Sequence, residues 1–255
     1  MELQNIADVI TALEKIINEC ESAQNPQGYF AALYKRMTVA VSEGILNGSF
    51  EDGKRMERLD LVFAQRYLDA QNCYQEQQPC SASWQFAFNN CKNKSLIVLQ
   101  HLLLGINTHI NLDLAIAAAA IAPGNGIYAL ENDFNRINDV IASLVDDVQE
   151  CLAKLWFPMR WLRRIAVHQQ EAVLNFSIGT ARKAAWANAL LLANMDPQQQ
   201  KIHIQQMDTS VKQIAQKICS PGLWSAFLLK FIRMTEYKDI TRTINIIDTT
   251  VAGIH

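Results

Sequence analysis

The stretch that decides the fold is KSLIVLQHLLLGINTHINLDLAIAAAAIA, which runs from Lys94 to Ala122. It is rich in leucine, isoleucine and alanine, and its apolar residues cover most of the circumference of a helix. Such a helix is normally buried, so the stretch predicts a central helix surrounded by other helices. It is long enough to cross a membrane, but the polar and ionisable residues in its middle would be costly there. We therefore predict a core helix of a soluble protein and no membrane span.

Helical spacing of apolar residues continues on both sides of this helix, and alternation of period two is almost absent. The ten glycines and six prolines fall at plausible helix ends. These patterns predict an all-α, single-domain bundle over residues 1–255, with about nine or ten helices around the buried central helix. The predicted helices are about 3–22, 27–47, 53–76, 82–91, 94–122, 130–156, 158–193, 197–219, 222–236 and 239–252.

The composition is that of a globular protein, and it narrows the range of partners. Half of the residues are hydrophobic and 19% are charged, so disorder is not expected. The 23 basic and 25 acidic residues give a net charge of -2 without any block of like charge, which argues against nucleic-acid binding. The six cysteines show no CxxC spacing, and the N-terminus lacks the pattern of a secretory signal. We expect a cytoplasmic protein with free thiols, in an oligomeric state that the sequence leaves open.

The central helix carries an unusual set of polar residues. His109 and Asp113 are four residues apart and share a face, while Asn107 and Asn111 form a second such pair on roughly the opposite side. His101 precedes His109 by eight residues and is offset by about 80° around the helix. A buried polar group without a partner costs about 1–3 kcal/mol, so these residues need a reason to be there.

Three interpretations of the His109–Asp113 pair are open. The histidine can act as an acid or base that the carboxylate orients, beside a pocket for a small, largely apolar molecule. The two side chains can instead bind the metal ion of a hydrolase. They can also form a non-catalytic network that holds neighbouring helices in register. We favour the small-molecule enzyme or binder, and we expect no cofactor and no tightly bound zinc, because further zinc ligands cannot be named.

Other candidate residues lie on the helices before and after the central one. Asp60 and Tyr67 lie on the same side of their helix, where they either line a pocket or belong to the core. Arg182 and Trp186 are four residues apart, so they can clamp a carboxylate or phosphate, or pack as a cation–π pair. The candidates are His109, Asp113, His101, Asp60 and Tyr67 for catalysis, and Asn107, Asn111, Arg182, Trp186 and Trp84 for binding.

The run Leu103 to Leu114, LLGINTHINLDL, resembles the central helix of an uncharacterised bacterial family of unknown function. The shared motif is Asn-X-His-Ile-Asn-X-Asp-Leu. Residues 58–70, the segment around Trp84 and residues 181–186 are also similar to that family, so the resemblance spans about residues 30–190. It implies an all-helical fold and a site on the central helix, and it implies no established activity.

A fainter similarity is to helical zinc phospholipases and nucleases, which use a His-X-X-X-Asp pair together with a His-X-X-X-Glu pair. His109 and Asp113 supply the first pair, but His168 and Glu171 have the wrong spacing for the second. The chain also has only five histidines. We therefore do not expect a three-zinc cluster.

Overall fold

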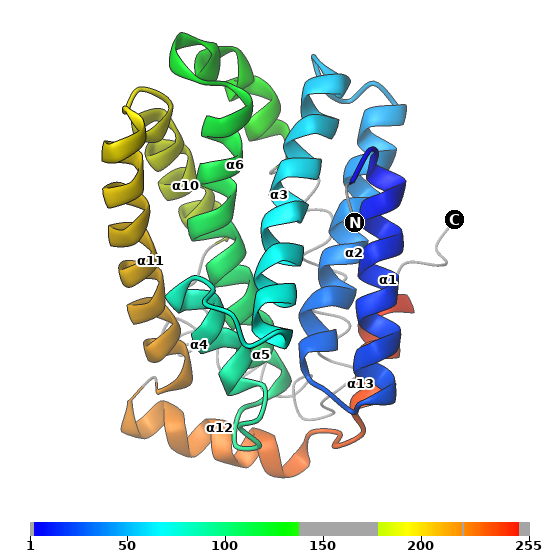
Figure 1. Cartoon of the computed structure of the whole chain (residues 1–255). Coiled ribbons are helices and arrows are strands. Elements are labelled where there is room, and N and C mark those ends of the chain that lie inside the picture. The colour runs from blue at the N-terminus through cyan, green and yellow to red at the C-terminus, as the bar shows by residue number, and fades with distance from the viewer. Residues whose placement is uncertain (1–2, 138–177, 221, 250–255) are drawn as a thin grey trace.

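The computed structural model describes residues 3–137, 178–220 and 222–249, and the regular structure in these ranges is helical (Figure 1). The helices outside the central one are α1 (Ile6–Ser22), α2 (Gln27–Leu46), α3 (Gly53–Gln75), α4 (Ala82–Asn90), α10 (Ile178–Ala193), α11 (Pro197–Cys219), α12 (Leu223–Thr235) and α13 (Ile240–Thr249). No strand occurs in these ranges, and the predicted all-α fold is confirmed. The predicted helices 130–156 and 158–193 lie mostly outside the described residues, but 131–137 and 178–193 are helical.

The central helix consists of two α-helical parts joined by a π-helical turn. These parts are α5 (Val98–Thr108), the π turn η1 (His109–Asp113) and α6 (Leu114–Ile121). The Thr108 hydroxyl donates to the Leu104 carbonyl at 3.2 Å, which competes with the α-helical ladder just before the turn. The π turn was not predicted, and it coincides with the His109–Asp113 pair.

The start of the central helix corrects the predicted boundary at Lys94, because α5 begins at Val98. The Asn93 side chain accepts hydrogen bonds from the backbone and the hydroxyl of Ser95 at 3.1 and 2.6 Å, which fixes a turn before the helix. The Gln100 side chain then accepts from the Ile97 N–H at 3.1 Å. After α6, Ala122 and Pro123 lead into a short 3-10 helix, η2 (Gly124–Leu130).

The central helix runs through both clusters of buried apolar residues. One cluster joins α5 to α1, α2, α3, α4 and α13, and the other joins η1 and α6 to η2, α10 and α11. The segment Val98–Ile121 is long and apolar enough to cross a membrane by length and composition, but 78% of its apolar window is buried inside the fold. That degree of burial is typical of a core helix, as predicted.

Three helices begin at carboxylates that come from distant parts of the chain. Asp133 accepts hydrogen bonds from two backbone N–H groups just before α3. Asp208 of α11 accepts hydrogen bonds from two backbone N–H groups at the start of α4. Glu236 accepts from the Val98 N–H at the start of α5, across 138 residues of sequence. Carboxylates at these positions satisfy N–H groups that a helix leaves unpaired. The bundle is thus tied together by capping contacts as well as by its core.

Gly105 allows α5 to pack closely against α2. A Cβ atom at this position would overlap the ring of Phe30. Phe30 in turn contacts the rings of Tyr67, Trp84 and His109. A larger side chain at Gly105 therefore displaces the aromatic residues that surround the central polar pair.

We expect Gly105→Ala to lower the free energy of unfolding by about 2 kcal/mol or more, because overpacking outweighs the gain in helix propensity. Urea unfolding followed by circular dichroism measures the change. Gly126→Ala is the matched control, since no atom lies within 4 Å of its added Cβ, and we expect it to stay within about 0.5 kcal/mol of wild type. Equal stability of the two variants would contradict the close packing of α5 on α2.

Candidate functional site

Asp113 is the centre of a buried hydrogen-bond network. Its side chain is 1% exposed and accepts three hydrogen bonds, one at Oδ1 and two at Oδ2. Arg66 Nε of α3 donates to Oδ1 at 3.0 Å. Trp84 Nε1 of α4 and His109 Nδ1 donate to Oδ2 at 2.8 and 3.1 Å. The buried charge is therefore compensated by a guanidinium and by neutral donors from three elements.

His109 lies in a cage of aromatic rings. Its imidazole stacks on Phe63 with ring centroids 3.6 Å apart, and the edge of Tyr34 approaches it at 4.5 Å. The remaining rings of the cage are those of Phe30, Tyr67 and Trp84. The cage holds the imidazole in one orientation and surrounds it with apolar surface.

The protonation of His109 follows from these surroundings. Burial lowers its pKa below the usual value; Asp113 acts in the opposite direction, and the charge of Arg66 adds to the lowering. The Asp113 carboxylate accepts the hydrogen on Nδ1, so the neutral ring presents a lone pair on Nε2. That Nε2 atom is buried and has no hydrogen-bond partner among the residues that the structure describes. The pair thus presents an oriented, unoccupied acceptor.

Asp60 is a second buried carboxylate, and its charge is poorly compensated. Its Oδ2 atom has no hydrogen-bond partner in the described part of the chain. Burial raises the pKa of Asp60 to about 7, and the charge of Glu57 adds to the increase. Burial also raises the pKa of Tyr34, and the charges of Asp60 and Asp113 add to the increase.

Asn107 and Asn111 make a separate contact between helices. Asn107 Nδ2 donates to the carbonyl of Val211 in α11 at 3.0 Å. Asn111 Nδ2 donates to Asn107 Oδ1 at 3.1 Å. These bonds join η1 and α5 to α11, and neither asparagine bonds to His109 or Asp113 in the described part of the chain. Their observed role is to hold helices together.

The other candidates also lie apart from the His109 cage. His101 packs its edge against Tyr29, and burial together with the charge of Arg233 lowers its pKa to about 4. Arg182 and Trp186 both contact Phe134. The Arg182 guanidinium lies 4.6 Å from the Phe134 ring centroid and donates to the Phe134 carbonyl at 2.6 Å. The Trp186 and Phe134 ring centroids are 4.8 Å apart.

Sequence reasoning missed four residues around the pair, namely Arg66, Phe63, Tyr34 and Phe30. Phe63 shares a face of α3 with Asp60 and Tyr67, and Arg66 follows Phe63 by three residues, so helical spacing was an available signal. The Arg66 side chain is 33% exposed, and in sequence it resembles an ordinary surface residue. Tyr34 comes from α2, and no local pattern connects it to the central helix.

The residues present offer little to a metal ion. Within residues 3–137, 178–220 and 222–249, no group of three or more His, Cys, Asp or Glu side chains is placed to hold one. Both oxygens of Asp113 already accept hydrogen bonds from the protein. His168 and Glu171 lie outside the described residues.

We expect Asp60→Asn to remove a pH dependence of stability. The pKa of Asp60 in the folded state, about 7, lies above the ordinary value of 3.8. Between these two pH values the folded state binds more protons than the unfolded state, so the folded protein loses stability as the pH rises from one to the other. At pH 8 the variant should be more stable than wild type by about 2–4 kcal/mol, and near pH 4 the advantage should vanish. Urea unfolding across this pH range measures the difference.

Asp69→Asn is the matched control for this prediction. Asp69 is exposed on the same helix and accepts a hydrogen bond from Gln65 at 2.7 Å. We expect its stability difference from wild type to stay small at every pH. A flat difference for Asp60→Asn as well would show that Asp60 is charged and well paired in the folded protein.

Comparison with known proteins identifies a family but no activity. No curated protein and no solved structure matches the chain. A family model described as Family of unknown function (DUF5995) matches residues 6–221, a wider stretch than the predicted resemblance over residues 30–190. The bacterial origin and the precise motif stay predictions. Because the match covers most of the sequence, including His109, Asp113 and their partners, the chain belongs to the family of unknown function DUF5995.

Proposed function

We propose that the protein is an enzyme or binder for a small, largely apolar molecule that carries a polar or acidic group, with His109 at its centre. The observation that supports this most directly is the buried Nε2 atom of His109, which no side chain or backbone group in residues 3–137, 178–220 and 222–249 satisfies. A buried acceptor without a hydrogen bond costs about 1–3 kcal/mol, and an apolar residue would avoid that cost. A hydroxyl or another donor of a ligand would satisfy the atom.

The arrangement assigns a role to each residue around the pair. Neutral His109 accepts a proton from the ligand as a general base, and Asp113 keeps its tautomer and stabilises the imidazolium that forms. Arg66 and Trp84 hold the Asp113 carboxylate in place. Asp60 has a pKa of about 7, so both its protonated and its ionised forms are present near neutral pH. In this proposal it donates a proton to the ligand or accepts one from it.

The π turn supports the same proposal. A π-helical turn in an α-helix is rare, and such turns are frequent at functional sites. Here the turn spans His109 to Asp113, and the Leu114 N–H closes it on the His109 carbonyl. The turn sets how the two side chains face one another, at the expense of regular α-helical bonding.

A non-catalytic scaffold is the second candidate function, and one observation favours it. Asp113 is fully engaged and ties α3 and α4 to η1, as a structural network would. A network selected only for helix register would also be expected to satisfy its other polar atoms. His109 Nε2 and Asp60 Oδ2 are not satisfied, and this difference leads us to prefer the small-molecule site.

We expect His109→Leu to leave the free energy of unfolding within about 1 kcal/mol of wild type, or to raise it. The substitution removes an unpaired polar atom, while Arg66 and Trp84 still bond to Asp113. Asp113→Ala should cost about 3 kcal/mol, because it leaves buried donors without an acceptor. Denaturant unfolding of the single and double variants measures both effects. Strong destabilisation by both single changes, with a large coupling between them, would support the scaffold instead.

Binding itself is tested by native mass spectrometry of the purified protein. We expect wild type to retain a small molecule that His109→Leu has lost, and the isolated molecule to raise the melting temperature of wild type when it is added back. His203→Gln is the matched control, because His203 already bonds to Asn188 at 2.8 Å and should not affect the ligand. If all three proteins carry the same molecules, or none, the proposed site is wrong.

A further inference from the structure

Helix α12 lies across the end of the bundle where α5 begins (Figure 1). It carries an exposed apolar stripe. Phe227, Phe231 and Met234 are 77%, 51% and 73% exposed. Their spacing of four and three residues places them on one face of the helix. Tyr237, just beyond the helix, is 41% exposed. Large apolar side chains gathered on one exposed face are typical of an interaction surface.

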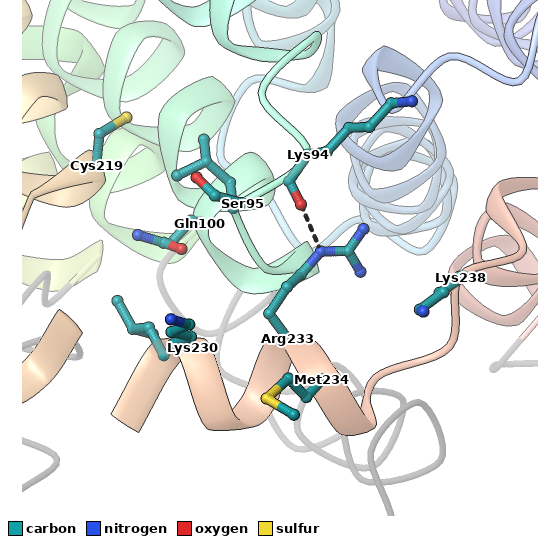
Figure 2. Close-up of a pocket in the computed structure, with 10 residues that line it drawn as sticks. Lys94, Ser95, Gln100, Cys219, Lys230, Arg233, Met234 and Lys238 are labelled. Atoms are coloured by element: carbon teal, nitrogen blue, oxygen red, sulfur yellow. Dashed lines mark hydrogen bonds between the residues drawn. The ribbon is translucent and has the colours of Figure 1, made fainter. Parts of the chain in front are cut away.

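An open cavity of about 690 Å³ lies beside this stripe (Figure 2). Figure 2 shows α12 forming one wall with Lys230, Arg233 and Met234, and the segment that leads into α5 forming the facing wall. Leu96 and Leu229 add buried apolar surface to the lining. Met234 therefore belongs both to the cavity and to the exposed stripe, so the two features form one continuous surface.

The cavity is lined by cationic side chains that the described part of the chain only partly neutralises. Arg233 donates to the Lys94 carbonyl at 2.8 Å and pairs with Glu236 at 3.5 Å. Glu236 is itself engaged by the N–H group that begins α5. Lys230 and Lys238 have no ion-pair partner among the described side chains. The positive charge is local, because the whole chain has a net charge of -2.

We propose that this end of the molecule docks on an anionic phospholipid bilayer, with α12 lying in the plane of the interface. Basic residues beside an aromatic and aliphatic face are the pattern of interfacial helices. The phosphate of an anionic headgroup lies in the cavity near Lys230, Arg233 and Lys238, and Phe227 and Phe231 enter the boundary between headgroups and acyl chains. Charge complementarity and the continuity of cavity and stripe select this partner. The inference is independent of the function proposed for His109.

The test is co-sedimentation of the full chain with vesicles. Wild type should bind vesicles of phosphatidylglycerol mixed with phosphatidylcholine, bind phosphatidylcholine alone weakly, and dissociate as salt is raised. The double variant Lys230→Ala/Lys238→Ala should lose about tenfold or more in affinity, since each lysine near an anionic surface contributes about fivefold. Phe227→Ser/Phe231→Ser should lose about tenfold as well, because it removes the inserted rings.

Matched variants elsewhere on the surface make the result specific. Lys54→Ala/Lys201→Ala removes two exposed lysines from α3 and α11, and Leu46→Ser removes a side chain that is 82% exposed at the end of α2. Both should bind vesicles as wild type does, and circular dichroism should show that every variant is folded. Equal losses in the control variants, equal binding to both vesicle types, or no binding would overturn the proposal. Dimerisation of the wild type in the absence of lipid would also overturn the proposal if Phe227→Ser/Phe231→Ser abolished it. In that case the stripe would bind a second copy of the chain.

Discussion

The buried carboxylate of Asp113 is the constraint on which the centre of the molecule depends. A carboxylate in an apolar interior is tolerated only when charged or polar donors compensate it. Here the donors come from α3, α4 and the central helix itself, so folding must bring these elements to one point. The same bonds determine which nitrogen of His109 carries the hydrogen. One interaction thus fixes both the packing of the helices and the chemical state of the site.

The fold explains the roles of some buried polar groups and leaves others unexplained. Asp133, Asp208 and Glu236 accept hydrogen bonds from backbone groups at helix starts, and their roles are explained by the fold. Among the described residues, His109 Nε2 and Asp60 Oδ2 have no such partner, and the His109 ring stacks on Phe63. Stability alone does not explain these two atoms, and a ligand would. This contrast is the physical basis for preferring a small-molecule site to a scaffold.

The sequence predicted the parts of the fold that depend on local periodicity. The apolar run around Leu104 is buried as expected, and the spacing of His109 and Asp113 correctly placed them in contact. The π turn was not predictable, because a single extra residue in a helical turn leaves no clear trace in apolar spacing. The predicted helix start at Lys94 was too early. Asn93 and Glu236 define the observed start at Val98 through contacts that helical spacing does not encode.

The parts of the site that come from other helices were harder to predict. Tyr34 and Trp84 reach His109 and Asp113 only through tertiary packing, so a single sequence offers no spacing that joins them. The exposed stripe of α12 was also missed, since a helical pattern at 222–236 does not reveal which face neighbouring helices cover. Asn107 and Asn111 resembled site residues in sequence, yet they bond to each other and to the α11 backbone.

The most direct test of the central claim is a nitrogen-15 NMR spectrum of the imidazole of His109, recorded from pH 6 to pH 8 and assigned with His109→Leu. Burial lowers the pKa of this ring, and Asp113 accepts its Nδ1 hydrogen. The spectrum should therefore show a neutral ring with the hydrogen on Nδ1 and an unprotonated Nε2 throughout this range. A hydrogen on Nε2, or a doubly protonated ring at pH 7, would contradict the claim that His109 presents a free acceptor to a ligand.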